Sequence, residues 1–264
     1  MPIGNPSDYL AKLFNLEGRV AILTGAGGFL IGELTRGLAR AGVKVAVADI
    51  RLEKAEKVAE EIRAEGGDAI ALELDVRDKA AFEKALSIVL KTFGDMHFVV
   101  NGAGTNAPTP FFDIRIEDWQ SVFDSQLTGT LLGCQVFGRY LVDKRRGSIV
   151  NISSASAGPP LSKAFAYSAA KSAIVNLTQN LAREWATSGV RVNTLRPGFF
   201  PTEWNRKNFI TPEREKAILG HTPMGRYGNP SELVGAVLWL MSDAASFVTG
   251  SDVKVDGGFS AMTI

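Results

Sequence analysis

The sequence predicts an α/β protein with a doubly wound, seven-stranded, mostly parallel sheet and helices on both faces. Two observations carry this prediction. Short apolar segments rich in Val, Ile and Leu alternate along the chain with segments of helical periodicity. The apolar segments also lack the alternation of a half-exposed strand, which is typical of parallel strands buried on both faces.

Each apolar segment is followed by a helical one. The predicted strands span residues 19–24, 44–49, 69–75, 97–101, 147–153, 190–197 and 251–258, and the predicted helices span 32–42, 52–67, 79–94, 113–143, 164–188 and 231–243. Units of this kind form right-handed crossovers that keep the strands parallel. No linker composition or repeat divides the chain, so we expect a single domain over 1–264 with a substrate-loop insert near 199–229.

The composition excludes several classes of function. Lys plus Arg number 29 and Asp plus Glu 28, so a net charge of +1 gives no electrostatic basis for binding nucleic acid or an anionic membrane. A single cysteine, Cys134, allows no intramolecular disulfide and no cysteine zinc cluster. The N-terminus lacks the apolar segment of a signal peptide, and no apolar run reaches the roughly 18 residues of a membrane span. We expect a cytoplasmic protein without a metal site.

The stretch TGAGGFLIG (24–32) follows the first predicted strand and precedes a helix, which is the position of a phosphate-binding loop. Glycines let the backbone approach a pyrophosphate, and the helix N-terminus supplies free N–H groups. The spacing departs from G-x-G-x-x-G, because Leu30 stands where the third glycine belongs. A tight turn without a ligand explains the same stretch.

Asp49 ends the second predicted strand. A carboxylate there accepts hydrogen bonds from both hydroxyls of an adenosine ribose and repels the 2′-phosphate of NADP. The glycine loop also contains no Lys or Arg for that phosphate, although Arg51 stands two residues after the aspartate. The pattern favours NAD, and an aspartate that caps a helix or a turn is the alternative.

The stretch YSAAK (167–171) places Tyr167 and Lys171 on one helix face. A lysine cation near a phenol lowers the pKa of the tyrosine, which makes it a proton donor and acceptor near neutral pH. This spacing is common by chance. Ser154, at the end of the fifth strand, strengthens the interpretation because its hydroxyl can reach the same substrate oxygen.

Taken in order, these motifs resemble those of the short-chain dehydrogenase/reductase family, whose fold is Rossmann-like. The resemblance runs from Leu16 to Gly258 and rests on TGAGGFLIG, Asp49, LDV (74–76), NGAG (101–104), Ser154 with Tyr167 and Lys171, PGFFPT (197–202) and VDGG (255–258). It implies an NAD(P)-dependent oxidoreductase that interconverts a secondary alcohol and a ketone, and a homotetrameric assembly.

The resemblance also implies residue roles. Tyr167 would be the general acid/base, Ser154 would hold the substrate oxygen, and Lys171 would bind the nicotinamide ribose and lower the pKa of Tyr167. Asp75 and Val76 would flank the adenine. The full set implied for the cofactor is Gly25, Gly27, Gly28, Phe29, Leu30, Ile31, Asp49, Asp75, Val76, Asn101, Ala103, Gly104, Tyr167, Lys171, Pro197, Gly198 and Thr202.

The sequence departs from the family pattern in two places. The second and third glycines of T-G-x-x-x-G-x-G are replaced by Phe29 and Ile31, and Gly32 follows one position later. We therefore expect one extra residue in the turn near 29–31, with Gly32 packed closely at the first helix. Gln126 stands where the family has an asparagine that supports a water-mediated proton relay to the lysine. The longer amide either sustains this relay with shifted geometry or impairs it.

Substrate specificity is expected from the loops after the strands. FFPTEWNRKNF (199–209) and HTPMGRYG (221–228) resemble a subgroup of sugar-acid dehydrogenases of the gluconate or mannonate/fructuronate type, which implies a sugar acid or a polyol as substrate. The residues expected to contact the substrate are Asn106, Ser154, Ser156, Tyr167, Phe199 and Arg206. A substrate carboxylate would pair with Arg206, Lys163 or His221, although a solvated surface charge explains each of them as well.

Other functions fit the same fold. A ketoacyl thioester or a steroid-like alcohol would require an apolar pocket, for which Phe199, Phe200, Trp204 and Phe209 are the candidates. A cofactor-binding scaffold with impaired turnover is consistent with Gln126 and the unusual glycine loop. Apolar helical surfaces at 111–141 and 164–186 indicate subunit contacts, and core packing explains the same residues.

Overall fold

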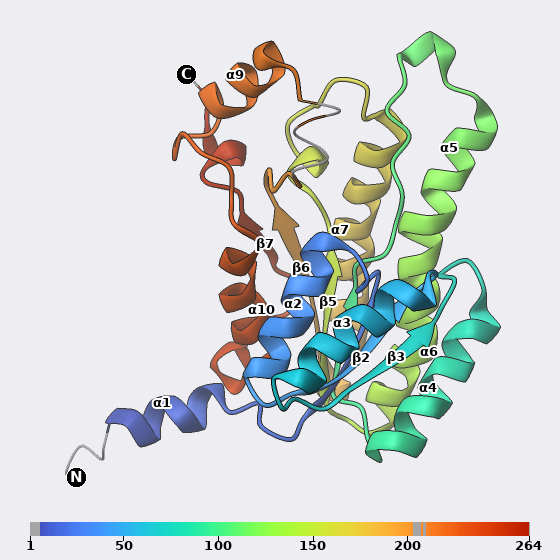
Figure 1. The fold of residues 1–264 in the computed structure, drawn as a ribbon, viewed down its shortest axis with the longest axis vertical. Helices are drawn as coiled ribbons and strands as arrows, with labels where there is room; N and C mark the ends of the chain where they lie inside the picture. The colour runs from blue at the N-terminus through green and yellow to red at the C-terminus, as the bar shows by residue number, and fades with distance from the viewer. Residues whose placement is uncertain (1–5, 203–206, 208–209, 264) are drawn as a thin grey trace.

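Seven parallel strands form one sheet in this computed structural model, which describes residues 6–202, 207 and 210–263. The sheet order is β3-β2-β1-β4-β5-β6-β7, and every neighbouring pair is parallel (Figure 1). The strands are β1 Val20–Thr24, β2 Lys44–Asp49, β3 Ala69–Glu73, β4 Phe98–Asn101, β5 Gly147–Ile152, β6 Val190–Pro197 and β7 Asp252–Val255. The predicted doubly wound sheet is confirmed, with no antiparallel strand among them.

Helices cover both faces of the sheet. The α-helices of the described residues are α1 Pro6–Phe14, α2 Phe29–Arg40, α3 Leu52–Ala64, α4 Lys79–Phe93, α5 Ile116–Phe123, α6 Gly129–Asp143, α7 Phe165–Trp185, α9 Pro212–Gly220 and α10 Val234–Met241. In β1, Leu23 packs into a core shared with α2, α3 and α10, whereas Ile22 packs into a core shared with α4, α6 and α7. Both side chains are fully buried, which explains why the strands are apolar without alternation.

Two of these helices were not expected from the sequence. Helix α1 projects away from the body of the molecule (Figure 1), with Tyr9 and Leu10 exposed. Helix α9 lies within the insert at 199–229. Its start carries ordinary signals, since the Thr211 side chain accepts a hydrogen bond from the Arg214 amide and Pro212 occupies the first turn.

The predicted helix at 113–143 is interrupted by a π-helical turn at Asp124–Thr128, between α5 and α6. There the Gly129 amide donates to the Asp124 carbonyl, five residues earlier. The Thr130 hydroxyl donates to the Gln126 carbonyl at 2.7 Å and stabilises the widened turn. Such turns are frequent at functional sites, and this one packs against α7.

The carboxyl ends of all strands meet at one edge of the sheet, because the strands are parallel. Strands β1 and β4 are neighbours there although two strands separate them in the chain, which creates the switch point where ligands bind in folds of this class. No helix in the described part of the chain is long and apolar enough to span a membrane.

Candidate active site

The glycine turn after β1 leaves the start of α2 without a cap. Gly25 has a φ of 73°, and a Cβ there would lie 2.8 Å from the Ala103 Cα, so only glycine fits. Gly28 precedes α2 in an extended conformation and provides no side-chain hydrogen bond to it. The first amides of α2 therefore point away from the helix with no side-chain acceptor, as a phosphate site requires.

The prediction of one extra residue in this turn was wrong. Phe29 to Ile31 form the first turn of α2, where the Gly32 amide donates to the Gly28 carbonyl at 2.9 Å. Helical dihedrals need no glycine, so the larger residues are tolerated. Ile31 is buried in the space above Gly102, where a Cβ would lie 2.5 Å from the Ile31 Cδ1, and Phe29 is half exposed.

Asp49 is buried beside the glycine turn. Its Oδ2 accepts a hydrogen bond from the Gly27 amide at 3.1 Å, and its Oδ1 accepts one from the Arg51 amide at 3.0 Å. A Cβ at Gly27 would lie 3.0 Å from this carboxylate, so the glycine permits the contact. Asp49 does not cap α3, whose N-cap is Arg51. The acid and the glycine turn form one unit at the switch point.

Thr24 joins this unit to the loop after β4, a role that the sequence did not suggest. Its Oγ1 accepts hydrogen bonds from the amides of Gly102 at 3.1 Å and Ala103 at 3.4 Å. The only local signal is a hydroxyl at the end of an otherwise apolar strand. The two loops that flank the switch point are thereby fixed relative to each other.

Asn101 has a side chain that points into the core instead of along the predicted cofactor path. Its Nδ2 donates to Asn151 Oδ1 at 2.8 Å, and Asn151 Nδ2 donates to Thr178 Oγ1 at 2.9 Å. Cys134 lies beside both asparagines, and burial raises the pKa of its thiol to about 12. Asn101 Oδ1 is buried without a hydrogen-bond partner among the described residues, and the role of Asn101 toward the cofactor stays a prediction.

The structure brings Ser154, Tyr167 and Lys171 together. Lys171 Nζ lies 5.4 Å from the centroid of the Tyr167 ring and donates to the Ile152 carbonyl at 2.7 Å. The Ser154 hydroxyl accepts a hydrogen bond from the Ser156 amide at 3.2 Å, and it lies close enough to the Tyr167 phenol to lower the pKa of that phenol. A hydroxyl from the segment after β5 and the phenol and amine of two α7 side chains thus lie close together.

Burial is the main influence on the pKa values of Tyr167 and Lys171. It raises the pKa of Tyr167, and the hydrogen bond from Ser154 offsets part of that increase. Burial also lowers the pKa of Lys171 to about 7, and that side chain is only 3 % exposed. The expected lowering of the tyrosine pKa by Lys171 is not present in the chain alone, because both groups are out of water.

Gln126 lies in the π turn, buried beside the loop after β4. Its Nε2 donates to the Thr105 carbonyl at 2.8 Å, and its buried Oε1 has no hydrogen-bond partner within the described residues. A Cβ at Gly104 would lie 2.2 Å from the Gln126 Cδ, so the last glycine of NGAG makes room for this amide.

The other expected site residues lie around the same edge. Arg77 forms an ion pair with Asp75 at 2.6 Å, and its hydrogen bonds lower the pKa of that carboxyl. Val76 is buried. The Gly198 amide, after Pro197, donates to the Val255 carbonyl at 3.0 Å.

The expected substrate residues differ in their surroundings. Ser156 is buried, and its hydroxyl has no partner in the part of the chain that is described, whereas Asn106 is exposed. The His221 ring lies 4.7 Å from that of Phe259, and Phe259 lies 5.1 Å from Phe199. Arg206, Trp204 and Phe209 lie outside the described residues.

Comparisons with known proteins agree with this geometry. The sequence model of the family described as enoyl-(acyl carrier protein) reductase, which represents short-chain dehydrogenases, matches residues 31–260. The uncharacterized oxidoreductase UxuB of Bacillus subtilis (strain 168) is 40% identical over 268 residues, which cover 94% of this chain and 96% of that protein. The chain belongs to the short-chain dehydrogenase/reductase family.

Solved structures of two family members are similar over nearly the whole chain. A provisionally assigned D-mannonate oxidoreductase from Haemophilus influenza, with bound NAD, has a TM-score of 0.89 and 37% identity, covering 94% of this chain and 97% of that one. A gluconate 5-dehydrogenase from Burkholderia cenocepacia J2315, in complex with NADP and tartrate, has a TM-score of 0.91 and 32% identity, covering 96% and 100%.

As a member of this family, the chain is a dehydrogenase that acts on CH–OH groups with a nicotinamide dinucleotide. Its residues fit that cofactor: the uncapped start of α2 suits the pyrophosphate, and the buried Asp49 beside Gly27 suits a ribose. The described residues contain no group of three or more metal-ligating side chains.

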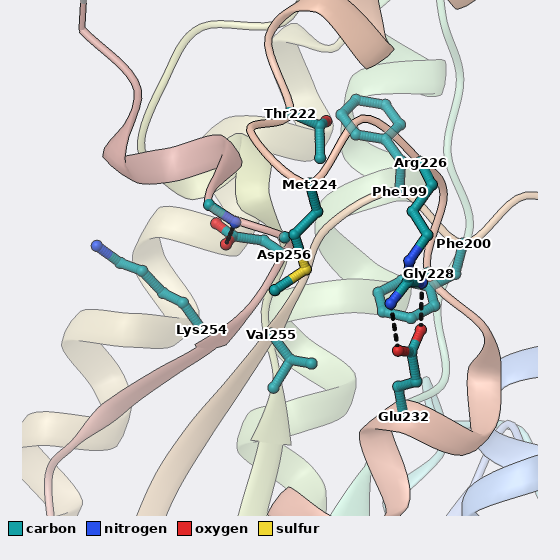
Figure 2. Close-up of a pocket in the computed structure, with 12 residues that line it drawn as sticks. Phe199, Phe200, Thr222, Met224, Arg226, Gly228, Glu232, Lys254, Val255 and Asp256 are labelled. Atoms are coloured by element: carbon teal, nitrogen blue, oxygen red, sulfur yellow. Dashed lines mark hydrogen bonds and ion pairs between the residues drawn. The ribbon is translucent and has the colours of Figure 1, made fainter.

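The cavity drawn in Figure 2 is lined by none of Ser154, Tyr167 and Lys171. Its volume is about 400 Å³, and Phe199 and Phe200 form part of its wall. Arg226 and Glu232 pair at 2.7 Å within it, as the dashed lines in Figure 2 show. The remaining lining residues are Thr222, Met224, Gly228, Lys254, Val255, Asp256, Gly257 and Gly258. The charged wall differs from the apolar pocket expected for a steroid or an acyl chain.

Lys171 should make stability depend on pH. Its pKa of about 7 in the folded chain lies below the value of about 10.4 for a lysine in an unfolded chain. Between these values the unfolded chain binds one proton more, so the stability of the wild type rises with pH relative to Lys171→Met. From pH 7 to pH 9 we expect the difference in free energy of unfolding to shift by about 2 kcal/mol in favour of the wild type, measured by urea denaturation.

Lys79→Met, at the exposed start of α4, is the control for loss of a lysine. A difference between wild type and Lys171→Met that stays constant from pH 7 to pH 9 would show that Lys171 remains protonated in the fold.

Proposed function

We propose that this chain is an NAD-dependent dehydrogenase that interconverts a secondary alcohol and a ketone on a sugar acid or a polyol. The observation that carries the proposal is the grouping of three side chains: Lys171 Nζ lies 5.4 Å from the centroid of the Tyr167 ring, and the Ser154 hydroxyl lies close enough to lower the pKa of the Tyr167 phenol. When bound, the nicotinamide supplies or accepts the hydride.

In this proposal the side chains of the chain itself manage the proton and the substrate oxygen. Ser154 Oγ donates a hydrogen bond to that oxygen, and Tyr167 Oη gives or takes its proton. Deprotonated Tyr167 and protonated Lys171 stabilise each other, because opposite charges in a buried site interact strongly. Lys171 Nζ also binds the ribose hydroxyls. The Gln126 amide replaces the family's asparagine in the relay, and its Oε1 accepts from a bridging donor.

The polar substrate is supported by the relatives named for gluconate and mannonate and by the charged wall next to Phe199. The buried Ser156 hydroxyl is available to a substrate hydroxyl. Asn106, Phe199 and Arg206 complete the proposed contacts, and Lys163 or His221 is the alternative partner for a carboxylate.

Turnover tests the mechanism. The purified chain with NAD is expected to oxidise sugar acids or polyols, followed by NADH absorbance. Tyr167→Phe should lower kcat by about 10²–10⁴-fold, because the proton donor is lost, while the Kd for NADH stays unchanged. Tyr9→Phe, on the exposed face of α1, is the matched control. Full turnover by Tyr167→Phe would refute the assignment, and activity on ketoacyl thioesters but not on sugar acids would refute the substrate class.

The preference for NAD rests on Asp49. Its buried carboxylate beside Gly27 would accept the ribose hydroxyls and repel a 2′-phosphate. We expect Asp49→Ser to increase the ratio of kcat/KM for NADP to that for NAD by at least about tenfold. Asp49→Asn keeps an oxygen acceptor without the negative charge. It therefore separates hydrogen bonding to the ribose from repulsion of the 2′-phosphate. Equal use of NAD and NADP by the wild type would contradict the preference.

We propose further that the chain works as a cytoplasmic homotetramer. Apolar side chains near the start of α5 support the assembly, since Phe111, Phe112 and Ile116 are exposed and Phe112 is 97 % exposed. The one cysteine is an unpaired, buried thiol, which fits a reducing compartment. Light scattering of the purified chain should give four times the mass of 28.3 kDa, and a monomer mass would contradict the assembly.

A further inference from the structure

Thr105 is held by the π turn through three of its atoms. Its amide donates to Ser125 Oγ at 3.1 Å, and its Oγ1 lies 3.0 Å from the same Ser125 Oγ. Its carbonyl accepts from Gln126 Nε2 at 2.8 Å. Ser125 Oγ also lies 3.3 Å from the Val122 carbonyl, to which it can donate when the Thr105 hydroxyl donates to it.

The two partners of Thr105 are buried, whereas Thr105 itself is exposed. Loss of either partner would leave a polar group of Thr105 without its hydrogen bond to the π turn, so the loop would be held less firmly. Consecutive residues of an α-helix point about 100° apart, yet Ser125 and Gln126 reach the same residue. They do so within the π turn, where helical geometry is widened.

The loop that follows Thr105 lies next to the start of α7. Further along the same loop, Ala107 and Thr109 share a small pocket with Lys163 and Phe165, which lead into Tyr167. The π turn itself packs against α7, the helix that carries Tyr167 and Lys171. The π turn thus contacts both the loop that contains Thr105 and helix α7.

We infer that Ser125 and Gln126 are positioning residues that fix Thr105 and thereby determine which substrates fit between this loop and Tyr167. The inference rests on the proposed function for its kinetic consequence. The hydrogen bonds from the π turn set the loop geometry before the substrate binds, so their loss weakens substrate binding more than it slows the chemical step.

Ser125→Ala is the decisive variant. We expect it to raise KM for the sugar acid or polyol by roughly tenfold, because one hydrogen bond that orients the loop is lost, with kcat within about twofold and the Kd for NADH unchanged. Thr105→Val should raise KM as well, whereas Thr105→Ser, which keeps the hydroxyl, should leave KM near the wild-type value. Ser121→Ala, on the exposed side of α5, is the matched control.

A double-mutant cycle of Ser125→Ala with Thr105→Val tests whether the pair acts together. The two effects on KM should be less than additive, because the hydroxyl contact is lost in both single variants. Equal losses in kcat and kcat/KM, or fully additive effects, would overturn the positioning role.

Hydrogen exchange tests the same contacts without any substrate. In Ser125→Ala the Thr105 amide, within 102–110, should exchange faster than in the wild type, and Ser121→Ala should leave it unchanged. Unchanged exchange in Ser125→Ala would overturn the inference even for an active enzyme. Faster exchange in a chain that is inactive on sugar acids and polyols would instead refute only the proposed substrate.

Discussion

A lysine amino group held out of water at the end of β5 is the constraint on which the rest of the site depends. Lys171 is 3 % exposed, and its Nζ reaches the Ile152 carbonyl at 2.7 Å. Burying a charge is costly unless polar groups surround it. The contact therefore requires that β5 end where α7 passes. The Ser153 hydroxyl adds a second link to the Lys171 carbonyl at 3.0 Å, and the next residue, Ser154, then faces Tyr167.

The parallel sheet determines where the residues around Asp49 lie relative to the catalytic group. Because β1 and β4 are neighbours, the glycine turn and the NGAG loop lie side by side, and Thr24 connects them. The cofactor unit around Asp49 and the catalytic group around Tyr167 come from distant parts of the chain. They meet only because every strand ends at the same edge.

Much of the fold and of the candidate site was predictable from the sequence, because both depend on short-range patterns. The strands are continuous apolar runs, and Asp49, Ser154 and Tyr167 stand at fixed distances from their ends. The π turn has no such signal, because one short widened turn leaves the segments before and after it with ordinary helical periodicity. The inward orientation of Asn101 depends on packing against Asn151, fifty residues away, and the start of α2 depends on Gly102 leaving space for Ile31.

Cys134 lies in the polar core beside the site, and these surroundings determine how readily its thiol reacts with oxidants. Only the thiolate reacts readily with oxidants and alkylating agents, and a pKa of about 12 leaves about one thiol in 10⁵ ionised at neutral pH. The side chain is also closed off between two asparagines. Activity should therefore be insensitive to peroxide acting on cysteine. A cysteine introduced anywhere on the surface would be the single reactive thiol, so the native chain can accept one site-specific label without prior removal of its own cysteine.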